Sequence, residues 1–212
     1  VAMFLKDIYE KLKKEVKVLQ GEETKDKVYC SDHTYPTEAA AQTAFERAKQ
    51  KLFDVNKWTD LEGINSTFEL YDQRGRRSIA GQPEVGFYMK IILPAPAPEN
   101  WVKITDINQD ATSAEFVVHP SEQPSERNET DPPTEHFFIK EATSTFRVER
   151  HGNQLLACEI GRDEGINNQG DEAGDRAVIN TLIAEGGWAG VQALQWNKLT
   201  DYLVHNIEAE TE

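Results

Sequence analysis

The sequence predicts an α+β protein in which an antiparallel sheet of seven strands is covered by a long C-terminal helix. After Trp58 the spacing of apolar residues changes from a helical period of about 3.6 to the strand period of two. The chain then ends in its longest helical pattern, which runs from about Asp175 to Asn206. Runs of strands flanked by helices are typical of α+β proteins with antiparallel sheets.

The composition favours one soluble, cytoplasmic domain. The chain has 212 residues and a net charge of −14. Negative charge repels phosphate backbones and anionic lipid surfaces, so we expect no nucleic-acid partner and no stable membrane insertion. No apolar run reaches the roughly 18 residues that a membrane-spanning helix needs. We expect a single domain at 27–207, preceded by an amphipathic helix within 1–20.

The first part of the chain reads as helix, strand, helix. In the N-terminal helix, at 3–19, the residues that share an apolar face are Leu5, Ile8, Leu12, Val16 and Leu19. A β-rich stretch at 27–35 predicts the first strand. Thr37 is the expected N-cap of the next helix, which runs to about Trp58 in one or two pieces. An apolar stripe along it is formed by Ala41, Phe45, Ala48 and Leu52.

Six more strands are predicted beyond Trp58, with spacings that suggest a meander. They are Thr67–Asp72, Glu84–Leu93, Trp101–Ile107, Thr112–His119, His136–Arg150 and Gln154–Ile160. In the clearest of them, the residues that alternate onto one face are Val85, Phe87, Met89, Ile91 and Leu93. Seven strands with one apolar face need a cover, and the C-terminal helix is the one element long enough to supply it.

This order of elements resembles the START-like superfamily, which includes Bet v 1 allergens, polyketide cyclases and the Hsp90 activator domain. The matching stretches are KVYCSDHTYPTEAAAQTAF, VNKW, EVGFYMKIIL, HFFIKEATSTFRVERHGNQLLACEIG and the final helix. The resemblance implies a helix-grip fold, in which the sheet wraps the last helix around an apolar cavity. It also implies that the first and last strands are neighbours, which would bring Cys30 near Cys158. We expect both thiols to be free.

The predicted cavity wall combines a helix face with two strands. On the helix, the inward candidates are Trp188, Val191, Gln195, Leu199 and Tyr202. On the strands they are Phe87, Met89 and Phe146, together with Lys140, which shares the parity of Phe146. Lys140 can face the cavity or lie at its rim in water, and Gln195 can be a satisfied core residue or contact a ligand. A bend is expected at Gly186-Gly187.

The sequence contains no catalytic motif, no metal-ligand spacing and no cofactor motif, so we expect no cofactor. The leading hypothesis is the binding of a small hydrophobic or amphipathic molecule, such as a lipid, between sheet and helix. One alternative is an enzyme of the cyclase, dehydratase or hydrolase kind that uses Lys140, Tyr88 or His119. Another is a protein-interaction module similar to the Hsp90 activator domain, which leaves a protein partner open.

Overall fold

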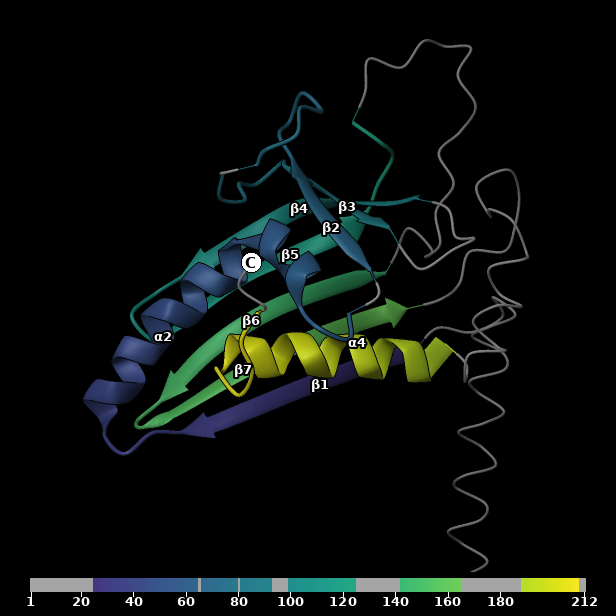
Figure 1. The fold of residues 1–212 in the computed structure, drawn as a ribbon. Coiled ribbons are helices and arrows are strands. Elements are labelled where there is room, and N and C mark those ends of the chain that lie inside the picture. Colours follow the sequence, from purple (N-terminus) through teal and green to yellow (C-terminus); the bar gives the residue numbers. More distant parts are fainter. Residues whose placement is uncertain are drawn as a thin grey trace, which may run out of the picture.

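A computed structural model describes residues 25–64, 66–79, 81–92, 99–124, 142–164 and 188–209 (Figure 1). In the last helix, side chains are described from Gln195 onward. The elements are β1 (Lys25–Thr34), α2 (Glu38–Phe53), the 3-10 helix η1 (Val55–Asp60), β2 (Thr67–Tyr71), β3 (Tyr88–Ile92), β4 (Glu99–Gln109), β5 (Ser113–Pro120), β6 (Thr143–His151), β7 (Gln154–Glu164) and α4 (Trp188–Leu203).

The strands form one antiparallel sheet in the order β1-β7-β6-β5-β4-β3-β2. From β2 to β7 each strand pairs with the next in sequence, which is the predicted meander. The first strand then pairs with the last and forms one edge of the sheet. The predicted seven-stranded antiparallel sheet is therefore confirmed, as is the neighbourhood of the first and last strands.

Two helices share the covered face of the sheet. In Figure 1, α2 and α4 both lie on this face, with α4 running along β1 and β7. α2 packs on β6 and β7 and also contacts α4. The C-terminal helix is thus not the only cover, contrary to the sequence-based expectation. Apolar residues of α2 and η1 fill the centre of the core, so the described part of α4 needs to cover only one side.

Trp58 lies at the centre of the core and is completely buried. Its ring centroid lies 5.6 Å from that of Phe68, 6.0 Å from that of Phe116 and 5.0 Å from that of Phe146. The indole Nε1 donates to the backbone oxygen of Lys51 at 3.0 Å. Aromatic pairs at these separations stabilise the fold beyond their burial alone. η1 therefore fixes the centre of the sheet, while α4 lies toward the β1 edge.

Two local predictions can be compared directly with the structure. Thr37 is the N-cap of α2, because its side chain accepts a hydrogen bond from the backbone nitrogen of Ala40 at 3.1 Å. The strand predicted from Glu84 begins only at Tyr88. A turn precedes it, in which the Phe87 nitrogen bonds the Glu84 oxygen. Val85 is therefore 52% exposed and does not continue the buried face of β3.

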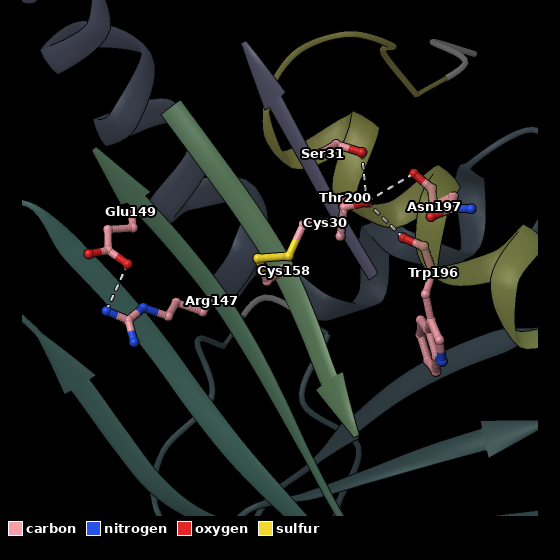
Figure 2. Close-up of a disulfide and its surroundings, with 8 residues drawn as sticks. All are labelled: Cys30, Ser31, Arg147, Glu149, Cys158, Trp196, Asn197 and Thr200. Carbon is pink, nitrogen blue, oxygen red and sulfur yellow. Dashed lines mark hydrogen bonds and ion pairs between the residues drawn. A yellow bond between two sulfur atoms is a disulfide. The ribbon is translucent and has the colours of Figure 1, made fainter. Parts of the chain in front are cut away.

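Cys30 and Cys158 are joined by a disulfide across β1 and β7 (Figure 2). The prediction of free thiols is wrong. The register of the two strands places the cysteines directly opposite each other, with their Cα atoms 4.2 Å apart. Ser31, the next residue, faces α4, so the alternation of strand side chains puts the disulfide on the outer face of the sheet. It ties the edge strand to its neighbour without entering the core.

Several predictions fall outside the described residues. They are the N-terminal helix, the first part of the predicted strand at 136–150, and the bend at Gly186-Gly187. In the described part of the chain, no helix combines the length and apolar character of a membrane-spanning segment.

Candidate functional site

A small apolar cavity of about 30 Å³ lies between the sheet and α4. Four strands and α4 contribute to its lining, which consists of Ile91, Val102, Val118, Pro120, Ala142, Thr143, Ser144, Phe146 and Trp196. A volume of this size holds roughly one water-sized group. The cavity lies in the region predicted from the sequence, but it is far smaller than a pocket for a drug-sized ligand.

Trp196 brings an unpaired polar atom to the lining of this cavity. Its side chain is buried, with 7% of the residue exposed, and its ring packs 5.5 Å from Phe146 and 6.2 Å from Phe68. The indole Nε1 is buried, and no atom of the described residues accepts a hydrogen bond from it. A buried donor without an acceptor costs about 1–3 kcal/mol. In Figure 2 the indole points away from the disulfide.

Gln195, the neighbour of Trp196, has a partner. Ser66 Oγ donates to Gln195 Oε1 at 2.8 Å, and both residues are buried. This bond ties α4 to the segment that precedes β2. Of the two alternatives left open by the sequence, the structure therefore shows Gln195 as a satisfied core residue.

The other predicted site residues occupy different places. Phe146 lines the cavity, whereas Met89 and Leu199 are fully buried in the core and Phe87 packs against the core half-buried. Tyr202 lines a separate pocket. Trp188 and Val191 belong to α4, but their side chains are outside the described set, as is all of Lys140. Their role in ligand binding stays a prediction.

Trp196 itself was absent from the predicted wall. The predicted stripe passed through Gln195 and Leu199, which lie next to Trp196 on the helical surface. The sequence did carry a signal, because Trp196, Leu199 and Leu203 follow at spacings of three and four. The buried face of α4 is wider than the stripe chosen from the sequence, and all three of these residues are buried.

Glu159 is a second residue that sequence reasoning missed. It lies on the covered face of β7, directly opposite Phe146 of β6, and it is completely buried. Lys27 of β1 is also buried and lies on the same face, two residues before Tyr29, the β1 partner of Glu159. The covered face therefore carries ionisable groups close to the apolar cavity, although neither is part of its lining.

A second pocket, here named the polar pocket, lies between α2 and the end of α4. It has a volume of about 260 Å³ and is lined by Arg47, Gln50, Lys51, Asp54, Tyr202, His205 and Glu208. It shares no lining residue with the apolar cavity.

His205 has an unusual backbone in this pocket. The Asn206 nitrogen bonds the Asp201 oxygen at 2.9 Å, and the His205 nitrogen bonds the Tyr202 oxygen at 3.2 Å. This is the Schellman pattern that ends many helices, and His205 occupies the position usually taken by glycine. Its φ is 66°, in the left-handed region, which costs a residue with a side chain roughly 1–2 kcal/mol.

The imidazole of His205 has one satisfied and one unsatisfied nitrogen. Nε2 lies 3.0 Å from the backbone oxygen of Ala44, and because a carbonyl only accepts, Nε2 carries the proton. Nδ1 is buried without a hydrogen-bond partner among the described residues, 3.7 Å from Glu208 Oε1. Burial lowers the pKa of His205, aided by the charges of Lys51 and Arg47 and opposed by the Ala44 bond and Glu208.

Lys51 also lines the polar pocket, where Tyr202 and Glu208 fix its side chain. Its Nζ donates to the Tyr202 backbone oxygen at 2.9 Å, lies 4.1 Å from the centre of the Tyr202 ring, and pairs with Glu208 Oε2 at 2.8 Å. Burial is the main cause that lowers the pKa of Lys51. Burial, with the nearby charges of Asp54, Glu208 and Asp60, raises the pKa of Tyr202 to about 12. The phenol is therefore protonated at neutral pH.

The architecture of the described chain is an open meander sheet, extended at one edge by its first strand and covered by α2 and the C-terminal helix. This is a helix-grip fold. The search for protein families found no match to the chain, and neither did the search of curated proteins. Solved structures are similar to it at low identity.

Three of these structures illustrate the level of similarity. A hypothetical protein from Helicobacter pylori is 12% identical, with a TM-score of 0.48, over 88% of this chain and 92% of that one. Norcoclaurine synthase from Thalictrum flavum, in complex with dopamine and hydroxybenzaldehyde, is 12% identical, with a TM-score of 0.39, over 89% and 92%. A major latex-like protein from Panax ginseng is 12% identical, with a TM-score of 0.40, over 86% and 99%. At this level of similarity they assign no function to the chain.

Proposed function

We propose that the chain binds a small, mostly apolar molecule that carries a hydrogen-bond acceptor, in the space between the sheet and α4. The observation that carries this proposal is the buried Trp196 Nε1, which lacks an acceptor beside an apolar cavity. A ligand that places a carbonyl, ether or hydroxyl oxygen against Nε1 recovers the cost of the unpaired donor. Its apolar part is stabilised by removal from water.

The remaining lining fits the same type of ligand. Apolar side chains dominate it, and the hydroxyls of Thr143 and Ser144 lie where β6 begins. Small-molecule sites commonly combine an apolar wall with a few polar groups that set orientation. None of the lining side chains titrates in the physiological range. This set of groups suits binding and orientation better than acid-base catalysis.

Binding requires the lining to move. A cavity of about 30 Å³ admits only one water-sized group, so a larger ligand must displace neighbouring side chains. That displacement costs packing free energy and reduces the apparent affinity. We therefore expect modest affinity for small aromatic probes, and tighter binding for a molecule whose shape matches the expanded space.

The test uses two probes of similar shape, acetophenone and ethylbenzene, which differ in the carbonyl acceptor. Trp196→Phe keeps an aromatic ring and removes the N–H donor. We expect acetophenone to bind the wild type about 5–10-fold more tightly than the variant, as one buried hydrogen bond implies. Ethylbenzene has no acceptor and should bind the variant at least as tightly as the wild type, because the smaller ring enlarges the cavity. Isothermal titration calorimetry measures these affinities.

Trp101→Phe is the matched control, because Trp101 is buried but is not part of the cavity lining. It packs 4.8 Å from Tyr71. This variant should bind acetophenone as the wild type does. Equal acetophenone affinity in the wild type and Trp196→Phe, or no binding of either probe to the wild type, would contradict the proposal.

We also propose that the protein works in an oxidising compartment, rather than in the cytoplasm expected from the sequence. The Cys30–Cys158 bond supports this, because protein disulfides persist mainly where thiols are not kept reduced. Protein isolated from its native cells under acid quench and treated with an alkylating reagent should gain no alkyl group at either cysteine. Full alkylation of both would contradict the proposed compartment.

A further inference from the structure

The polar pocket has two features that folding alone does not require. His205 occupies a left-handed backbone position that glycine would adopt without strain. Its side chain is only 7% exposed and lines the pocket, yet Nδ1 has no hydrogen-bond partner among the described residues and lies 3.7 Å from Glu208 Oε1. Strained backbone positions that persist are frequent at ligand sites. An unpaired ring nitrogen at such a position indicates a hydrogen-bond partner that the protein core does not supply.

The ion pair beside His205 is asymmetric. The Lys51 side chain is 13% exposed and is fixed by the Tyr202 oxygen and ring, whereas the Glu208 side chain is 65% exposed. Glu208 lies in the segment after α4, and its two oxygens face Lys51 at 2.8 Å and His205 Nδ1 at 3.7 Å. The cation is therefore preorganised, and the carboxylate is the exchangeable partner.

We propose that the polar pocket binds the carboxylate of a small molecule, which replaces Glu208 between Lys51 and His205. One ligand oxygen accepts from Lys51 Nζ, and the other approaches Nδ1 more closely than Glu208 does. His205 takes up a proton from solvent on binding, so that Nδ1 becomes a donor. Arg47 lines the same pocket and adds a second cation, while Glu208 acts as an internal competitor. The body of the ligand lies in the rest of the polar pocket, whose total volume is about 260 Å³.

The charged and titratable groups around His205 determine how carboxylate binding depends on pH. The groups that face it or line its pocket are Arg47 and Lys51 of α2, Asp54 at the end of α2, Tyr202 of α4, Glu208 after α4, and Tyr35 after β1, whose hydroxyl bonds the Val204 oxygen. Among these, His205 is the group whose ordinary pKa lies nearest to neutral pH. Carboxylate binding should therefore strengthen as pH falls from 8 to 6, while the ligand itself stays ionised.

The experiment titrates the intact protein with sodium benzoate at constant ionic strength and follows the imidazole NMR signals of His205, assigned with His205→Asn. Glu208→Gln removes the competitor and should bind benzoate at least fivefold more tightly than the wild type. Glu62→Gln makes the same change in net charge at an exposed position outside the pocket. It should bind benzoate as the wild type does. Inorganic phosphate serves as the comparison anion.

Two variants test the cations. Lys51→Met should weaken benzoate binding at least tenfold, and Arg47→Gln, at an exposed position, should weaken it severalfold without disturbing the fold. No saturable shift of His205 in either the wild type or Glu208→Gln would overturn the proposal. So would equal tightening in Glu62→Gln, or an unchanged affinity in Arg47→Gln. Phosphate binding as tight as benzoate binding would overturn the assignment to carboxylates. None of these results depends on the apolar cavity.

Discussion

Gln195 and Trp196 are neighbours in α4, but of their two side chains only that of Gln195 has a hydrogen-bond partner among the described residues. The sequence singled out Gln195 because an amide on an apolar helix face is costly unless it is paired. It did not predict the partner, because Ser66 is distant in sequence and lies outside any regular element. It also did not single out His205, since nothing in the sequence distinguishes a histidine at a helix end from a surface residue.

Removal of the Ser66 hydroxyl should destabilise the protein by about 1–2 kcal/mol, because Gln195 Oε1 is then buried without a donor. Gln195→Leu should cost a similar amount by leaving Ser66 unpaired. The double variant should recover part of the loss, since neither polar group remains unpaired. Urea unfolding gives the three free energies of unfolding. Strict additivity would show that the two side chains do not interact.

His205→Asn should reduce the loss of stability on acidification. The pKa of His205 is lowered in the folded protein, chiefly by burial, so the unfolded chain binds its proton first. The stability that the neutral ring contributes is therefore complete above the pKa of the unfolded chain, which is about 6.5. This stability is lost as the pH falls from that value toward the lower pKa of the folded protein. The slope reaches at most about 1.4 kcal/mol per pH unit.

Asn is the suitable replacement because it tolerates the left-handed backbone of this position. The free energy of unfolding, measured between pH 8 and pH 5, should fall less steeply in the variant than in the wild type. Parallel pH profiles of the two proteins would show that the folded and unfolded pKa values of His205 do not differ.

At the scale of elements, the change of period after Trp58 predicted all six strands that the structure describes beyond it, but not every boundary. β3 starts late because Gly86 adopts a φ of 92° in a turn that hydrophobic alternation does not report. The helical stretch predicted to end near Trp58, in one or two pieces, forms two pieces, α2 and η1, which meet at Asp54. The cysteine pair lies in two strands whose neighbourhood the resemblance to the START-like superfamily implied. The bond itself depends on a register that the sequence does not specify.

The disulfide should stabilise the edge of the sheet. It closes a loop with a sequence separation of 128, and bonds across long loops restrict the unfolded chain most strongly. Cys30→Ala combined with Cys158→Ala should therefore lower the free energy of unfolding by about 2–4 kcal/mol. Wild-type protein with a reducing agent should match the double variant in guanidinium unfolding. An unchanged midpoint under reducing conditions would refute this role of the bond.

At the scale of the whole molecule, the order of strands and the position of the C-terminal helix followed from the sequence. The sequence did not predict that α2 and α4 together cover the sheet. The pattern of α2 was interpreted as an ordinary amphipathic helix, without a large share of the core. A cavity between the sheet and the C-terminal helix was expected, but among the predicted wall residues whose side chains are described, only Phe146 lines the small cavity present there. Its small volume depends on how Trp196 and the aromatic core pack, and period and spacing carry no information on such packing.

Trp196 is the most direct reporter of ligand binding in the space beside α4, because its Nε1 is the proposed donor to the ligand. The chain has four tryptophans, so ¹⁵N-labelled protein should give four indole N–H signals, which single Trp→Phe variants assign. Trp58 Nε1 already donates to Lys51 and provides an internal reference. On titration with acetophenone, the Trp196 signal should move downfield and exchange more slowly with solvent, while the Trp58 signal stays in place. Saturable acetophenone binding with an unchanged Trp196 signal would contradict the proposed site.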